Sequence, residues 1–126
     1  MNEVFSIDYK DRLVQNEQDV QELALRFRQD MKLEMDGINS AVELLESIGV
    51  KIIEMDYERQ FSGTCNTAGT VPVIVINKNM TPERKRLTIF HELGHLLLSF
   101  ADDADMEKLC TVFANEVLIP SKVLRR

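Results

Sequence analysis

The residues whose types and spacing are best suited to catalysis form one pentapeptide, His91-Glu92-Leu93-Gly94-His95. On an α-helix, two residues four positions apart are separated by about 40° around the axis and about 6 Å along it. Imidazoles with this spacing can bind one zinc ion at a Zn–N distance of about 2.0–2.1 Å. Glu92 follows the first histidine, so its carboxylate can accept a proton from a water that the metal activates. The pentapeptide therefore predicts a metal-dependent hydrolytic site with Glu92 as the catalytic base.

A chance match on an amphipathic helix is the alternative explanation of this pentapeptide. The chain has two histidines, and both lie in the motif, which favours a metal site. A catalytic zinc normally has three protein ligands and a water at the fourth position. Because no third histidine exists, the missing ligand has to be a carboxylate or a thiol.

Glu107 is the preferred third ligand. It follows His95 by 12 residues, enough for the chain to reverse and to bring the first turn of another helix past the metal. An acidic residue in the first turn of a helix is also favoured by the helix dipole, so its presence there has a structural explanation as well. The alternatives are Cys110, one turn further along, and the acidic residues of the intervening linker, Asp102, Asp103 and Asp105.

Size and charge limit the classes of protein to which the chain can belong. Its 126 residues are expected to form a single domain, with 44% hydrophobic and 29% charged residues as in ordinary globular proteins. The net charge of −6 offers no general basic surface, so direct binding of nucleic acid is not expected. A local basic cluster is expected to form a solvated helix entrance rather than a phosphate site: Lys78, Arg84, Lys85 and Arg86.

Targeting signals and paired cysteines are not found in the sequence. The chain does not open with a signal-peptide pattern, and no apolar run approaches the length of a membrane span. Cys65 and Cys110 lack the spacing of a paired motif. We therefore expect a cytoplasmic protein with two free thiols and no membrane partner.

The apolar pattern changes period along the chain and predicts an α+β fold. Residues 1–15 have no clear period. Helices are predicted at 17–33, at 41–48 with Ser40 as N-cap, at 82–100 after Thr81-Pro82, and at 106–118 before Pro120. Strands are predicted at 50–55 and 71–77, while 61–65 fits a strand or a loop. The expected architecture is a pair of N-terminal helices, a small sheet, the active-site helix and a helix carrying the third ligand.

Substrate binding and oxyanion stabilisation are less well specified by the sequence. An exposed edge strand, for which residues 73–77 are the candidate, could bind an extended substrate by strand addition. Tyr57 is the nearest candidate for stabilising the oxyanion.

Two longer motifs resemble the ImmA/IrrE family of metallopeptidases. The first is Arg86-Leu87-Thr88-Ile89-Phe90-His91-Glu92-Leu93-Gly94-His95-Leu96-Leu97-Leu98, similar to the family's "R-x-x-x-x-H-E-L-G-H-x-L-L" helix. The second has Glu107, Phe113-Ala114, Leu118 and Pro120 in the spacing of the family's later "E-x-x-A-N-x-F-A-x-x-L-L-x-P" helix. The similarity covers residues 38–120. Cys110-Thr111 stands where the family pattern has Ala-Asn.

The resemblance implies a minimal zincin-like metalloprotease domain with its metal-site core at residues 71–120. It implies one zinc ion with a bound water, held by His91, His95 and Glu107, and Glu92 as the catalytic acid and base. The implied substrate is a helix-turn-helix transcriptional repressor, cleaved to release phage, mobile-element or stress genes. The alternative is a non-catalytic zinc-containing module that binds a repressor or antitoxin-like partner. A deformylase is disfavoured because Cys65 lacks the required glycine-containing context.

Overall fold

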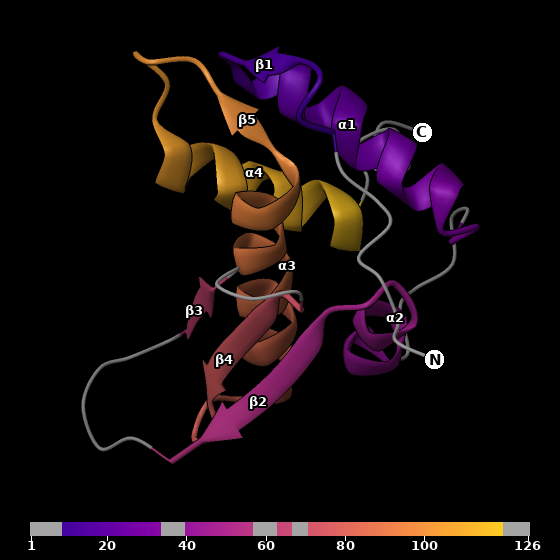
Figure 1. The fold of residues 1–126 in the computed structure, drawn as a ribbon, viewed down its shortest axis with the longest axis vertical. Helices are drawn as coiled ribbons and strands as arrows, with labels where there is room; N and C mark the ends of the chain where they lie inside the picture. Colours follow the sequence, from indigo (N-terminus) through magenta and orange to yellow (C-terminus); the bar gives the residue numbers. More distant parts are fainter. Residues whose placement is uncertain (1–8, 34–39, 57–62, 67–70, 120–126) are drawn as a thin grey trace.

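A computed structural model describes residues 9–33, 40–56, 63–66 and 71–119 (Figure 1). It contains four helices and five short strands within these ranges. In chain order they are β1 (Leu13–Val14), α1 (Glu17–Asp30), α2 (Ala41–Ser47), β2 (Lys51–Met55), β3 (Gly63–Asn66), β4 (Val73–Asn77), α3 (Pro82–Leu97), β5 (Ser99–Phe100) and α4 (Met106–Leu118).

The first helix begins with a complete capping box. The Asn16 side chain accepts a hydrogen bond from the backbone of Asp19, and the Asp19 carboxylate accepts one from the Asn16 backbone. The helix ends at Asp30, three residues before the predicted end. Lys32 adopts a left-handed conformation with φ of 58°, which stops the helix earlier than the apolar period indicated. The Asp36-Gly37 stop signal lies outside the described residues.

The second helix and the strand after it agree with the sequence signals. Ser40 caps α2 by accepting a hydrogen bond from the Glu43 backbone N–H. Gly49 has φ of 93°, a value that glycine adopts at little cost, and it turns the chain from α2 into β2.

The larger sheet has three strands in the order β2-β4-β3. β4 pairs in parallel with β2 and antiparallel with β3, where Gly63 lies opposite Ile76. Pro72 precedes β4, so its missing N–H costs no ladder hydrogen bond, as predicted. The prediction that residues 73–77 form an edge strand is wrong, because both neighbours of β4 are occupied. The open edges among the described strands belong to β2 and β3.

The third and fourth helices begin at the capping residues found in the sequence. Thr81 accepts from the Arg84 backbone and Asp105 from the Lys108 backbone. α4 has the predicted bounds. α3 ends at Leu97 rather than 100, because Ser99 and Phe100 form β5, which pairs in parallel with β1. This small sheet involves the N-terminal stretch for which the sequence predicted no element.

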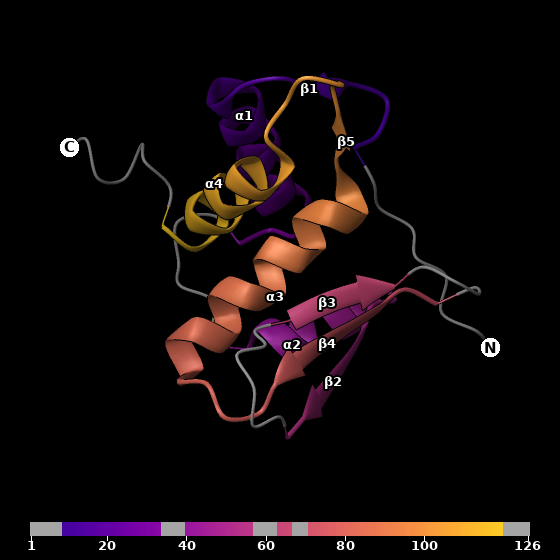
Figure 2. The ribbon, with the colours of Figure 1, turned by 90° about the vertical axis from the view of Figure 1, so that its left-hand side faces the viewer.

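Helix α3 lies in the middle of the molecule, with the sheet on one side and α4 on the other (Figure 2). α1 packs on α4 and completes the core, in which Phe27 contacts the rings of Phe90 and Phe113 edge to face. The buried Arg28 guanidinium donates a hydrogen bond to the backbone carbonyl of Val117, near the end of α4. The fold is α+β, as predicted, and α3 packs against α4. No helix in the described part of the chain is long and apolar enough to cross a membrane.

Candidate metal centre

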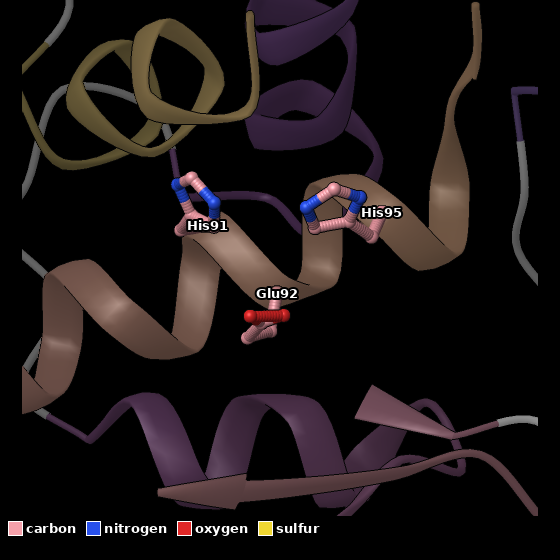
Figure 3. A group of neighbouring side chains, drawn as sticks. All are labelled: His91, Glu92 and His95. Carbon is pink, nitrogen blue, oxygen red and sulfur yellow. The ribbon is translucent and has the colours of Figure 1, made fainter. Parts of the chain in front are cut away.

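His91, Glu92 and His95 lie together on α3 (Figure 3). Their ligand atoms all lie within 4.8 Å of one another, and the centroids of the two imidazole rings are 5.3 Å apart. The rings sit side by side on one face of the helix, while the Glu92 carboxylate leaves the helix between them on the side of the sheet (Figure 3). Spacing along one helix is sufficient to place these three groups.

Glu107 meets the two histidines from the first turn of α4. Its Oε1 lies 2.9 Å from His91 Nε2, and its Oε2 lies 3.0 Å from His95 Nε2. The hydrogen bond from His91, together with the charges of both histidines, holds the pKa of Glu107 below its ordinary value. One carboxylate from a second helix therefore faces both imidazoles.

The donor set fits a zinc ion. Two imidazole nitrogens and one glutamate carboxylate are a known catalytic zinc set, with the remaining position left for water. Ligand atoms of a tetrahedral zinc site lie about 3.3–3.5 Å apart when the bonds are about 2.0–2.2 Å long. The observed N···O separations of 2.9 and 3.0 Å are only a few tenths of an ångström shorter. A small outward movement of Glu107 would accommodate the ion.

Thr111 orients the first histidine, a role that the sequence did not reveal. Its hydroxyl donates to the backbone carbonyl of Glu107 at 3.1 Å and lies 3.0 Å from His91 Nδ1. Since the only hydroxyl proton is used for Glu107, Nδ1 must be the donor to Thr111. In this structure Nε2 in turn donates to the Glu107 carboxylate, so both ring nitrogens face acceptors. Release of the Nε2 proton would leave the lone pair there, with Nδ1–H still held by Thr111, which is the tautomer that metal binding needs. The available signal was the four-residue spacing from Glu107 to Thr111, which places both on one face of α4.

Removal of this hydroxyl is expected to weaken metal binding. Thr111→Val keeps the shape of the side chain but loses the acceptor for His91, and the zinc affinity should fall about 10- to 100-fold. Competition with a chromophoric chelator measures the change. Thr111→Ser keeps the hydroxyl and should bind zinc nearly as the parent does. A valine variant with unchanged affinity would show that Thr111 does not orient the ring.

Cys110, the alternative thiol ligand, is fully buried in the contact between α3 and α4, against Gly94. A Cβ added to Gly94 would lie 3.2 Å from Cys110 Sγ and 3.5 Å from its Cα, so the motif glycine permits this approach. Burial, with the nearby carboxylates of Glu107 and Glu92, raises the pKa of Cys110 far above its ordinary value. A thiol in this environment stays protonated and fills space between the helices.

The linker aspartates have other positions and roles. Asp105 caps α4 through the Lys108 backbone and thereby fixes the turn that carries Glu107. Asp102 and Asp103 lie exposed in the turn between β5 and α4, and among the described residues neither forms an ion pair with a histidine. Of the predicted third-ligand candidates, Glu107 is the one that the structure brings to both imidazoles.

Glu92 is nearly buried, at 9% exposure, and Cys65 of β3 lies against it. Burial and then the negative charge of Glu92 raise the pKa of Cys65 to about 11, so this thiol is neutral and can donate a hydrogen bond to the carboxylate. The contact links the sheet to the proposed catalytic base. Both cysteines are free thiols, as predicted.

A pocket of about 520 Å³ opens beside these residues. Glu107 and Thr111 of α4 and the His91-Glu92 pair form one end. Gly63 of β3 contributes backbone, and the other end follows α3 toward its first turn along Thr88, Leu87 and Arg84. Tyr57, the predicted oxyanion-stabilising residue, lies outside the described residues.

Comparison with known proteins places this site in a family. The family model described as the IrrE N-terminal-like domain, Peptidase_M78, matches residues 45–126, from α2 through the sheet and both site helices. The radiation response metalloprotease IrrE of Deinococcus radiodurans is 37% identical over an alignment of 67 residues, gaps included; the match covers 41% of this chain and 20% of that protein. The match therefore spans about a fifth of the length of this relative. Because the family model covers most of the chain, including α3 and α4, the chain belongs to the IrrE N-terminal-like family of metallopeptidases.

Proposed function

We propose that the protein is a zinc-dependent endopeptidase. The observation that carries the proposal is the convergence of Glu107, from α4, on both imidazoles of α3 beside the carboxylate of Glu92. A site that only stabilises the fold closes with four protein ligands and has no use for a base next to the first histidine. Three ligands, a base and an adjoining pocket are the parts that hydrolysis requires.

His91, His95 and Glu107 would hold the zinc ion. When bound there, zinc supplies a Lewis acid that lowers the pKa of water and polarises a peptide carbonyl. The three ligands come from two helices, so the site depends on the contact between α3 and α4. Thr111 keeps the proton of His91 on Nδ1, away from the ion.

Glu92 would carry the proton during hydrolysis. Its carboxylate accepts a proton from the attacking water, whose oxygen forms a bond to the carbonyl carbon. The C–N bond then breaks, and Glu92 returns the proton to the leaving amine. The Cys65 thiol, which faces Glu92, would limit its rotation without competing as a base, because that thiol is neutral.

The open edge of β3 would bind the substrate backbone. β3 pairs with β4 on one side, and its other side is free among the described strands. Since Gly63 lines the pocket, a polypeptide paired with β3 would run past Glu92 and His91. This assigns to β3 the role that the sequence predicted for residues 73–77.

The proposed substrate is a helix-turn-helix transcriptional repressor. Support for this class comes from the resemblance of the two site helices to the ImmA/IrrE family. The net charge of −6 favours contact with the repressor protein rather than with its DNA. An endopeptidase of this type would act on the repressor in the cytoplasm.

Metal removal tests the proposal directly. The purified chain loaded with zinc is incubated with helix-turn-helix repressors encoded beside its gene, and fragments are identified by mass spectrometry. We expect site-specific cleavage, its loss after dialysis against a chelator, and its return with about one equivalent of zinc per chain. Manganese and cobalt in parallel identify which ions support activity. Binding of a repressor without cleavage under every metal condition would contradict the proposal and support the non-catalytic binding module.

A further inference from the structure

The pocket continues beyond the metal-site residues, and Arg84 lines its far end. Arg84, Thr88 and His91 follow one another at steps of four and three residues, so they share one face of α3. Seven residues of helix correspond to about 10 Å along the axis. A substrate bound across the histidines would therefore extend within reach of the Arg84 guanidinium.

The charges of the pocket are separated between its two ends. Glu92 and Glu107 lie at the metal-site end, and Arg84 lies at the other. Its neighbour Lys85 is neutralised by Glu54, with Nζ and Oε1 2.6 Å apart. Arg84 forms no ion pair with any residue in the described part of the chain. Its guanidinium is therefore available to an anionic group that enters the pocket.

Helix stability does not explain an arginine at this position. Arg84 lies in the first turn of α3, where its backbone N–H is capped by Thr81. A cation in the first turn is disfavoured by the helix dipole, while a glutamate there would complete a capping box with Thr81. Residues that oppose a local structural preference are expected at functional sites, where the function favours them despite their cost in stability.

We propose that Arg84 determines specificity by binding an acidic side chain of the substrate two or three residues from the scissile bond; this rests on the proposed peptidase function. An extended chain advances about 3.3 Å per residue, so three residues cover the 10 Å from His91. Because the arginine side chain is long, a separation of two substrate residues is also within its reach. The planar guanidinium can bind both oxygens of one carboxylate, which gives it an advantage over lysine at such a site.

The space between the two ends of the pocket fits this arrangement. A Cβ at Gly63 would lie 2.5 Å from Thr88 Cγ2, so the glycine lets β3 approach α3 while adding no side chain to the pocket. Leu87 is half-buried beside Thr88 and provides an apolar wall. A substrate backbone can therefore lie along β3 and direct one side chain toward Arg84.

Digestion of a peptide mixture tests the proposal. The zinc-loaded chain is incubated with peptides from a digested unrelated proteome, and the residues flanking each new terminus are read by mass spectrometry. Aspartate and glutamate should exceed lysine and arginine about fivefold at one position two or three residues from the cut. Arg84→Glu should reverse this ratio, and Arg84→Lys should retain part of it. Lys51→Glu, at an exposed cation on the opposite edge strand β2, should behave as the parent does.

The variants separate specificity from folding. Because Arg84→Glu replaces an exposed residue and completes a capping box, α3 should stay folded, and circular dichroism checks this. The role of Arg84 would be overturned by either of two results. One is cleavage that depends on zinc and Glu92 but shows no preference for acidic residues. The other is an acidic preference that persists in Arg84→Glu. Complete absence of cleavage by the parent would instead count against the peptidase function.

A binding measurement decides the role of Arg84 even without cleavage. Three fluorescein-labelled ten-residue peptides carry aspartate, asparagine or lysine at three alternate positions and are otherwise identical. Fluorescence anisotropy with the zinc-loaded chain should give about fivefold tighter binding of the aspartate peptide than of the lysine peptide. This order opposes the net charge of −6, so general electrostatics cannot produce it. Equal affinities, or tighter binding of the lysine peptide, would overturn the proposal.

Discussion

Glu92→Gln is expected to lower kcat for repressor cleavage by about 10²- to 10⁴-fold, the usual contribution of a positioned acid and base. Glutamine keeps the size of the side chain and can still accept a hydrogen bond from Cys65. It cannot take the proton of the attacking water. The variant should therefore bind the repressor and retain zinc while cleavage slows by this factor. Initial rates of fragment formation, with metal content measured on the same sample, test both parts.

The metal content of this variant also tests how Glu92 is used. Glu92 belongs to the group of ligand atoms within 4.8 Å, so geometry alone would allow it to bind the ion. A proton-transfer role requires that Glu92→Gln hold one zinc per chain with unchanged affinity. Loss of zinc together with activity would identify Glu92 as a ligand and exclude the proposed mechanism. Glu92→Asp, which shortens the side chain by one methylene, should restore part of the rate.

Glu107→Ala is expected to reduce zinc affinity by more than the 10- to 100-fold typical of losing a residue that only orients a ligand, because it removes a direct ligand. The remaining histidines are too few to hold a catalytic zinc. Glu107 is largely exposed, with 71% of its side chain accessible, so the substitution should leave the fold intact. Metal analysis after gel filtration and a zinc competition titration measure the loss.

Two matched variants test the competing third ligands. Cys110→Ala removes the buried thiol next to Gly94, and Asp102→Ala removes an exposed linker carboxylate. Both should keep one zinc per chain. If Glu107→Ala retains the metal while either of these loses it, the third ligand has been assigned to the wrong residue.

The sequence predicts the helices well where their signals are local. Thr81-Pro82 starts α3 and Asp105 starts α4, and both capping residues act through backbone groups three residues away. The bounds of α4 follow from this cap and a regular apolar period. The end of α1 was predicted three residues too late, because residue type gives no signal for the left-handed conformation of Lys32.

The pairing of strands that lie far apart in the sequence could not be predicted from such local signals. The order β2-β4-β3 depends on how strands separated by loops align on α3, and the apolar run of β4 suits a central strand as well as an edge. β1 and β5 contain two residues each, too few to show a period, and lie far apart in the sequence. Their pairing is a product of the assembled core.

The site residues show the same difference between local spacing and long-range packing. His91, Glu92 and His95 are fixed by spacing on one helix, so the motif alone placed them together. Glu107 required a reversal of the chain, for which the number of intervening residues gave only a range of candidates. Thr111 depends on how closely α4 approaches α3, a distance determined by Gly94 and Cys110 across the contact. Sequence spacing cannot supply that distance.

The packing of α1 has a consequence for where this domain begins. The family match starts at residue 45, yet Phe27 covers the rings of Phe90 and Phe113, and Arg28 satisfies a carbonyl near the end of α4. A segment cut to the matched region would leave the outer face of α4 uncovered. The position of α4, and with it the geometry around Glu107, therefore depends on packing by residues that precede the matched segment.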